Sequence, residues 1–312
     1  MVAAAAGCGF RAGRLGHSPR EPAVQNVVFG IVTGSILAVA TLGFALVRQT
    51  ENFLNIAHAQ MMALGAFVGV VLVDTYGMNI FAAGAITVVG LGILGVVLSS
   101  VFFQPVRHQG GTVLLFTSIG LALMMYAAIL ALFGTQARFY PDVSGSLHRF
   151  AGIGIATNEL VIIGLAFGSI VALQLFLNGT GLGRAIRAVA SNDDLARVRG
   201  VPVRTVSNTI WFISSAFGAM AGVMLGVLGA VNTEIGWHNI LIVLAAAVLG
   251  GLRSITGVIL AGLLLGIMMD VSALFIPTAY RPVVAFGVLV AVLILRPEGI
   301  LSVQRRKDAV VA

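Results

Sequence analysis

The chain has 312 residues, of which 59% are hydrophobic and only 9% are charged, and its mean hydropathy is +1.05. These values exclude an ordinary soluble domain, because repeated apolar runs of about 20 residues match the hydrocarbon thickness of a bilayer. The net charge of +7 does not indicate nucleic-acid binding, since in a membrane protein a basic excess reports loop topology, and the single cysteine excludes a disulfide framework or a cysteine-rich metal site within the chain.

The apolar runs predict an all-α fold, a polytopic transmembrane helical bundle of about 8–10 spans. Residues 1–23 contain arginines, prolines and small residues but no apolar h-region, so we expect a disordered or non-native N-terminal tail rather than a signal peptide. The transmembrane domain is expected over residues 24–302, and a cytoplasmic C-terminal tail over residues 303–312.

The first span is predicted near residues 27–47. Gly30, Gly34 and Ala38 follow one another at four-residue spacing in it. This spacing places small residues on one helix face, where a neighbouring helix can approach closely.

Polar residues crowd the entry to the second predicted span: Asn52, Asn55, His58 and Gln60. Polar groups at membrane depth are costly unless they find partners or water, so they are expected to point inward. Two interpretations remain open: they hydrogen-bond neighbouring helices, or they line the path of a transported solute. No metal site is expected, because His58 has no second histidine or carboxylate at ligand spacing.

Three further spans are predicted at residues 80–103, 113–133 and 159–177. The long segment at residues 134–157 mixes glycines with polar residues, which indicates an ordered surface loop. It is either a docking surface for a solute-binding protein or a passive connector.

The most charged stretch of the chain follows, at residues 179–208, between two apolar runs. A short amphipathic helix is predicted from Gly183 to Arg199, with an apolar strip of Ile186, Val189 and Ala190. Asp193 and Arg197 are spaced to pair at i, i+4, and Gly200 and Pro202 end the helix. This helix either lies in a groove of a soluble partner or rests on the membrane surface with its arginines on anionic lipid.

The last part of the chain contains two patterns of glycines. Ser214, Gly218, Gly222 and Gly226 recur every four residues, which predicts a ridge pressed against another helix. The pair Gly250 and Gly251 interrupts an apolar run near residues 240–275, which is typical either of a discontinuous helix pair beside a translocation path or of a kink. The last span is predicted at residues 282–295.

The distribution of arginines orients the protein. If residues 179–208 face the cytoplasm, alternation of about nine spans also places Arg48, Arg107, Arg253 and the basic C-terminal tail inside, and leaves Arg138, Arg149 and Arg281 outside. The bias agrees with the positive-inside rule. It puts the N-terminal tail outside, so either that tail is not native or an element before residue 79 is re-entrant.

The residues favour transport over catalysis. A nucleotide-binding P-loop needs a lysine, and the only lysine of the chain is Lys307, in the tail. The chain is therefore not expected to be an enzyme or an ATPase itself. An ion-coupled secondary transporter of small solutes is the alternative, but such proteins normally use buried acids, and the acids here lie near predicted span ends.

Four blocks of the sequence resemble the permease subunits of branched-chain amino acid ABC importers, the leucine, isoleucine and valine type. They are LNIAHAQMMALGAF at 54–67, GLGRAIRAVASNDDLARVRGVPV at 181–203, AAAVLGGLRSITGVILAGLLLGI at 245–267 and LRPEGIL at 295–301. Their order and spacing match the family over most of residues 27–302. In that family the second block is the cytoplasmic loop that couples to the ATPase.

The resemblance implies a permease of the bacterial inner membrane that uses ATP hydrolysed by other subunits. Its expected partners are a paralogous second permease, two cytoplasmic ATP-binding subunits that hold ATP and Mg²⁺, and an extracytoplasmic solute-binding protein. Relatives in the wider family also import urea, short amides and other amino acids. The coupling residues are expected to be Gly183, Arg184, Arg187, Ala190, Asp193, Asp194, Arg197 and Gly200.

Overall fold

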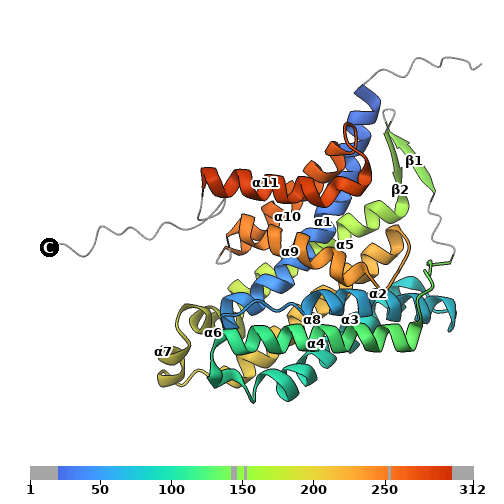
Figure 1. Cartoon of the computed structure of the whole chain (residues 1–312). Helices are drawn as coiled ribbons and strands as arrows, with labels where there is room; N and C mark the ends of the chain where they lie inside the picture. The colour runs from blue at the N-terminus through green and yellow to red at the C-terminus, as the bar shows by residue number, and fades with distance from the viewer. Residues whose placement is uncertain (1–19, 142–145, 151–152, 252–253, 297–312) are drawn as a thin grey trace, which may run out of the picture.

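The computed structural model describes residues 20–141, 146–150, 153–251 and 254–296 (Figure 1). Arg253, most of the predicted N-terminal tail, the C-terminal tail and nearly all of the block at 295–301 lie outside these residues. The helices are α1 (Arg20–Glu51), α2 (His58–Asp74), α3 (Ile80–Leu98), α4 (Gly111–Phe133), α5 (Thr157–Gly179), α6 (Gly181–Ser191), α7 (Asp193–Val198), α8 (Val203–Leu228), α9 (Ile235–Gly250), α10 (Ile255–Ser272) and α11 (Arg281–Leu295).

The predicted helical membrane bundle is confirmed. Seven of the described helical segments are long and apolar enough to cross a membrane, and α2 and α9 are shorter apolar helices. The third span combines α3 with a π-helical turn, η1 (Ser99–Phe103). Short 3-10 turns, η2 (Arg107–Gln109) and η3 (Thr278–Tyr280), precede α4 and α11. The first helix begins earlier than the predicted span, at Arg20.

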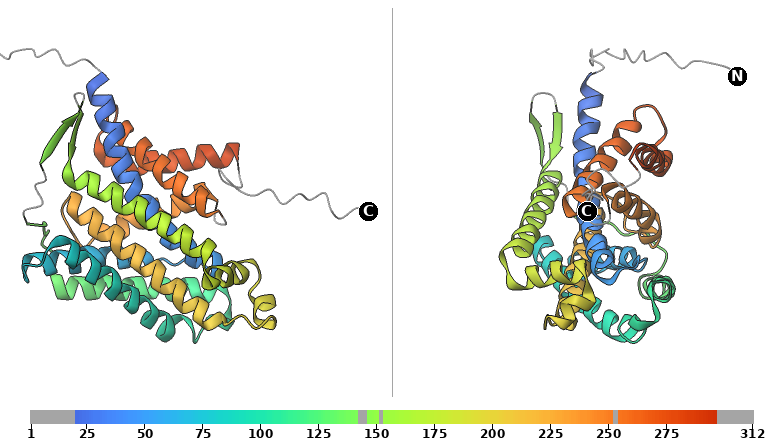
Figure 2. Two further views of the ribbon diagram at one scale, coloured as in Figure 1. Left: turned by 180° about the vertical axis from the view of Figure 1, so that it is seen from behind. Right: turned by 90° about the vertical axis from the view of Figure 1, so that its left-hand side faces the viewer.

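Helix α1 passes through the middle of the bundle, with α5 on one side and α9 and α10 on the other (Figure 2). Its small residues lie against the backbone of α10. A Cβ atom on Gly30 would come within 2.6 Å of the Cα of Ile267, and one on Gly262 within 2.7 Å of the Cα of Ala38. The small residues spaced four apart therefore form a close contact between α1 and α10, as the sequence pattern predicts. We call this contact the α1–α10 seam.

The glycine ridge of α8 lies against α2 over part of its length. Gly222 contacts the backbone of Met62, and a Cβ on Gly65 would come within 2.6 Å of the carbonyl oxygen of Ala219. Gly218 faces the ring of His58, whereas Gly226 faces the ring of Tyr140. The last glycine of the ridge therefore accommodates an aromatic side chain from a loop rather than the backbone of α2.

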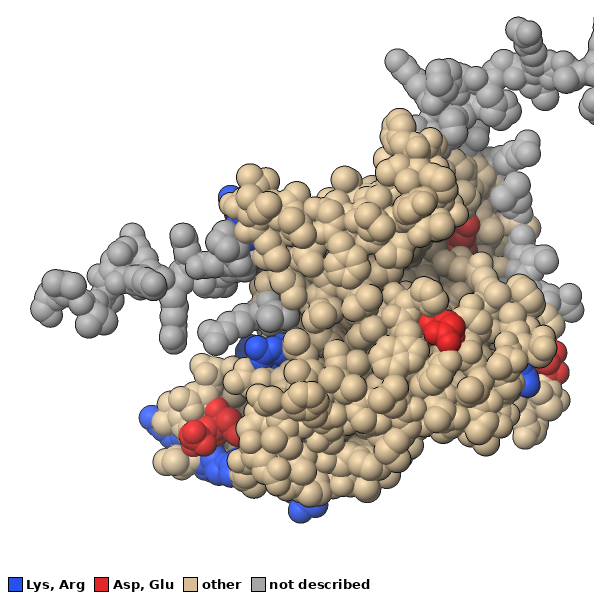
Figure 3. All heavy atoms as spheres, in the orientation of Figure 1, with Lys and Arg blue, Asp and Glu red and all other residues tan. Residues whose placement is uncertain are grey.

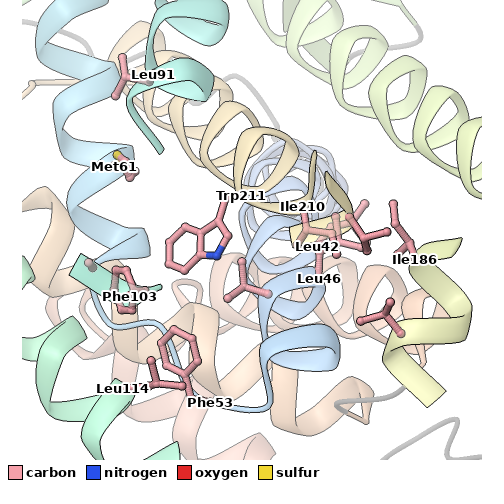
Figure 4. Packing of buried hydrophobic residues seen from close by; sticks show 14 of the residues in the cluster. Leu42, Leu46, Phe53, Met61, Leu91, Phe103, Leu114, Ile186, Ile210 and Trp211 are labelled. Carbon is pink, nitrogen blue, oxygen red and sulfur yellow. The ribbon is translucent and has the colours of Figure 1, made fainter. Parts of the chain in front are cut away.

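An aromatic cluster joins α8 to the ends of α1 and α3. The rings of Phe103 and Trp211 are 4.6 Å apart between centroids, and those of Phe53 and Phe103 are 5.4 Å apart. Figure 4 shows these rings beside Leu42 and Leu46 of α1, in the same buried cluster. Ile186 of α6 belongs to the same buried cluster.

The interrupted apolar run forms two antiparallel helices, α9 and α10, rather than one kinked helix. Gly251 has a φ of +84°, a left-handed conformation that favours glycine. The backbones of Gly250 and Gly257 touch at the turn, and farther along the pair Ile242 packs in one cluster with Leu265. The glycines therefore allow a tight helical hairpin.

The segment predicted as an irregular surface loop contains a β-hairpin of β1 (Leu147–Phe150) and β2 (Ile153–Ala156), paired antiparallel. The side chain of Gln25 holds this hairpin to α1. Its Nε2 donates to the carbonyl oxygen of Gly154 at 2.7 Å, and its Oε1 accepts from the amide of Gly154 at 3.1 Å. The loop is thus ordered by contact with the first helix.

The α1–α10 seam gives a stability prediction. The change Gly34→Ala places a methyl group 2.8 Å from the carbonyl oxygen of Leu263, and overpacking of this kind costs about 1–3 kcal/mol. We expect a Tm lower by several degrees in a thermal-shift assay of the purified protein. The matched change Gly120→Ala, in α4 with open space around it, should leave the Tm unchanged or slightly higher; equal losses would contradict the role of the seam.

Candidate coupling site and translocation path

The charged stretch predicted from the sequence lies at one end of the bundle. Helices α6 and α7 follow α5 there, next to the last turn of α1 and the first turn of α8 (Figure 1). In Figure 3, charged atoms gather at this end, whereas the broad face beside it is almost entirely uncharged. Among the residues predicted to couple to the ATPase, the exposed ones include Arg184, Arg187, Ala190, Asp194, Arg197 and Gly200.

Three contacts fasten α6 to the end of α5. Thr180 caps α6, its hydroxyl accepting from the amide of Gly183 at 2.9 Å. Gly183 touches the backbone of Leu177, so that position has no room for a side chain. Arg187 folds back and donates to the carbonyl oxygen of Leu177 and, at 3.0 Å, to Asn178 Oδ1. Arg187 therefore satisfies carbonyl groups at the C-terminus of α5.

The prediction of one helix from Gly183 to Arg199 is wrong, because two helices occupy this segment. Asn192 interrupts them in an extended conformation, and its side chain caps α7 by accepting from the amide of Leu195 at 2.9 Å. Asparagine is a favoured N-cap, and Asp193 and Asp194 in the next turn suit the positive end of a helix. A left-handed Gly200, with φ of +78°, follows α7.

The predicted apolar strip divides between two environments. Ile186 and Val189 are buried against the chain's own core, while Ala190 is exposed. The apolar face of α6 is therefore covered by the protein itself. The larger part of the exposed apolar surface is on α7, where Leu195 is 55% and Val198 is 85% exposed. The apolar pattern of α6 did not indicate that Leu195 and Val198 of α7 are exposed.

An ion-pair network joins α7 to the rest of the bundle. The Arg107 side chain lies 3.3 Å from Asp193 and 3.4 Å from Glu51 at the end of α1. Asp193 also pairs with Arg197 at 3.4 Å, as the spacing predicts. Ser207 of α8 donates to Glu51 at 2.5 Å. The network connects α1, the η2 turn, α7 and α8 through groups that are partly shielded from water.

The sequence analysis missed Glu51, Gln104 and Asn208 as members of this end of the molecule. Gln104 donates to Asn208 Oδ1 at 3.0 Å, which adds a second link to α8. All three lie at predicted span ends, and that position was the available signal. Their position at span ends does not indicate which span ends lie next to each other in the fold.

His58, a candidate for the translocation path, is a packing residue in this structure. It is 1% exposed; its Nε2 lies 2.9 Å from the carbonyl oxygen of Ala40, and its Nδ1 lies 3.4 Å from Ser214 Oγ. Since a carbonyl only accepts, Nε2 carries the proton. The ring thus links α1, α2 and α8 and agrees with the hydrogen-bonding interpretation.

The other candidates for the translocation path lie in surroundings that differ from those of His58. Asn52 is exposed, has a φ of +60° and accepts from Arg48 at 2.6 Å. Asn55 is buried, and its Oδ1 has no hydrogen-bond partner within the part of the chain that the structure describes. Gln60 is buried against Gly236 of α9. Gly250 and Gly251 form the turn of the α9–α10 hairpin.

The family model for the permease component of the branched-chain amino acid transport system matches residues 26–293. The chain belongs to this family of permeases. The match covers α2 to α10 completely and most of α1 and α11.

Characterised relatives resemble this permease over most of its length. It is 29% identical to the high-affinity branched-chain amino acid transport system permease protein BraD of Pseudomonas aeruginosa, over 89% of this chain and 95% of BraD. It is 30% identical to LivH of Escherichia coli K12, with the same coverage. LivM of the same bacterium, also a permease protein of that system, is 25% identical over 86% of this chain and 68% of LivM.

The ion-pair network makes a prediction about the mobility of α7 in this permease. The change Arg107→Gln removes the cation that bridges Asp193 and Glu51, so the amides of Asp193–Val198 should exchange with deuterium roughly 5-fold faster, the equivalent of about 1 kcal/mol. The measurement is hydrogen exchange of the purified protein. Arg204→Gln removes an exposed charge nearby and serves as the control; unchanged exchange in Arg107→Gln would show that the network does not hold α7.

Proposed function

We propose that this chain is the membrane-spanning permease subunit of an ATP-binding-cassette importer for branched-chain amino acids or a related small polar solute. Membership of the family supports the transporter role, and the names of BraD and LivH support the amino acid class. The protein would reside in the inner membrane of a bacterium, in several passes.

The energy for transport would come from other subunits. The only lysine of the chain, Lys307, stands in no phosphate-binding motif, and a P-loop requires one. We therefore propose that ATP and Mg²⁺ bind to two cytoplasmic partner subunits and that this chain holds no nucleotide of its own.

Helices α6 and α7 would form the surface that contacts the ATP-binding subunits. The observation that carries this proposal is the attachment of both helices to several spans at once: α6 to the end of α5, and α7 through Arg107 to Glu51 of α1. A partner that pushes on the exposed Leu195 and Val198 would move these span ends as a rigid group. A helix that only rests on lipid needs no such attachment.

The remaining partners would be a second permease and a solute-binding protein. The chain also resembles LivM, so two related permeases of one system are a reasonable pair. The solute-binding protein would dock at the end opposite α6 and α7, where the β-hairpin lies (Figure 1).

The change Val198→Asp tests the coupling surface. Val198 is 85% exposed, so the variant should fold and enter the membrane. A charge buried without a partner in the interface should lower ATP-dependent uptake of radiolabelled L-leucine by the assembled importer at least about 10-fold. Ala190→Asp should act in the same direction. Val198→Thr, which has nearly the same size as valine and adds no charge, is the control, and normal uptake by Val198→Asp would refute the coupling role.

The energy source separates this function from an ion-coupled transporter. Uptake by proteoliposomes of the complete complex should require ATP on the side of α6 and α7 and should persist when an ionophore collapses ion gradients. Uptake that needs no nucleotide and stops with the ionophore would instead establish secondary transport.

A further inference from the structure

The first turn of α9 lies inside the membrane domain rather than at its surface. Gln60 packs against Gly236, with its side-chain amide 2.8 Å from the position of a Cβ there. Met62, two residues after Gln60 in α2, contacts Gly222 of α8. Gly222 lies less than two turns before the end of α8. The start of α9 is therefore about 10 Å below the end of α8.

A contact with α4 gives the same depth for the start of α9. The Tyr126 hydroxyl donates to Glu234 Oε1 at 2.6 Å, just before α9 begins. Tyr126 is about two turns, roughly 10 Å, before the end of α4. The rings of Tyr126 and Trp237 are 6.3 Å apart in an edge-to-face arrangement. A carboxylate and two aromatic rings thus meet below the end of the bundle away from α6 and α7.

The surroundings of Glu234 are unusual for this depth. Its side chain is exposed, and among the described residues no arginine or lysine pairs with it. An ionised carboxylate facing lipid would be costly, so acids at membrane depth face the bundle interior or water. The face that carries Glu234 is therefore turned toward an aqueous path and not toward lipid.

Two further groups at this place have hydrogen-bonding capacity that the described residues leave unused. Gln60 is 1% exposed, and its Oε1 has no hydrogen-bond partner among the described residues. In the described part of the chain, no side chain caps the N-terminus of α9. The first turn of a helix of this length attracts anions through its free amide groups and its dipole.

We propose that Glu234, Tyr126, Trp237, Gln60 and the first turn of α9 form a transient binding site for a zwitterionic amino acid on its way through the membrane. Glu234 binds the α-ammonium group, which the two rings flank through cation–π contact. The first turn of α9 faces the α-carboxylate, and the unpartnered Oε1 of Gln60 is an acceptor for the α-ammonium group. The proposal rests on the proposed function and deepens it: urea and short amides have neither charge, so they would gain nothing from this site.

Thiol labelling tests whether the site is open to water, without any need for transport. In the assembled importer, with Cys8 replaced by serine, Glu234→Cys should react with a charged, membrane-impermeant thiol reagent. Met124→Cys, at nearly the same depth and on the opposite side of α4, where Met124 is 58% exposed, is the lipid-facing control and should not react. A Glu234→Cys variant that is unreactive from both sides of the membrane would overturn the proposal.

Uptake then tests the ligand class. Loss of a charge-assisted hydrogen bond should lower ATP-driven uptake of radiolabelled L-leucine at least about 10-fold in Glu234→Gln. The matched control Asp74→Asn removes an exposed acid at the end of α2 and should transport normally. Normal leucine uptake by Glu234→Gln would contradict the site. An unmodified complex that takes up no leucine with ATP would contradict the proposed function instead, and the labelling result would still decide whether the site faces water.

Discussion

Close backbone contact between α1 and its neighbours is the interaction on which this permease depends. Lipid tails are as apolar as leucine, so helices in a bilayer associate through close packing rather than through the hydrophobic effect. Gly30 and Gly34 allow that packing against α10, where no larger side chain fits. Because α1 also contacts α5, α8 and α9, this one helix holds the bundle together and connects both of its ends.

The two ends of α1 have different partners. At its beginning, Gln25 binds the β-hairpin, and Asn26 donates to the backbone of Asp270, which pairs with Arg281 at 2.9 Å. At its end, Glu51 takes part in the network with Arg107 and Asp193. In the coupling that we propose, a displacement of α7 would reach the central helix through these ion pairs, and α1 would transmit it to the opposite end. This arrangement gives a physical basis to the coupling role that we propose for α6 and α7.

Helices α2 and α9 give the bundle its irregular backbone at membrane depth. Such backbone is tolerated where it is buried in protein or lines a water-filled cavity. The start of α2 is of the first kind, because His58 is enclosed by α1 and α8. The start of α9 is of the second kind in our proposal, because Glu234 is exposed beside it. In our proposal, a helix that begins at membrane depth therefore serves packing in α2 and solute binding in α9.

The sequence by itself determined the class of fold, the approximate spans, the close-packing faces of α1 and α8, and the Asp193–Arg197 pair. These features depend on hydropathy and on spacings of three or four residues, which act within one helix. Only the tertiary structure decided that Ile186 and Val189 are covered by the protein's own core, that Arg107 joins Glu51 to Asp193, and that Tyr126 meets Glu234. These contacts join residues that are far apart in the chain, and a local pattern shows that a face is apolar or charged but not which neighbour will cover it.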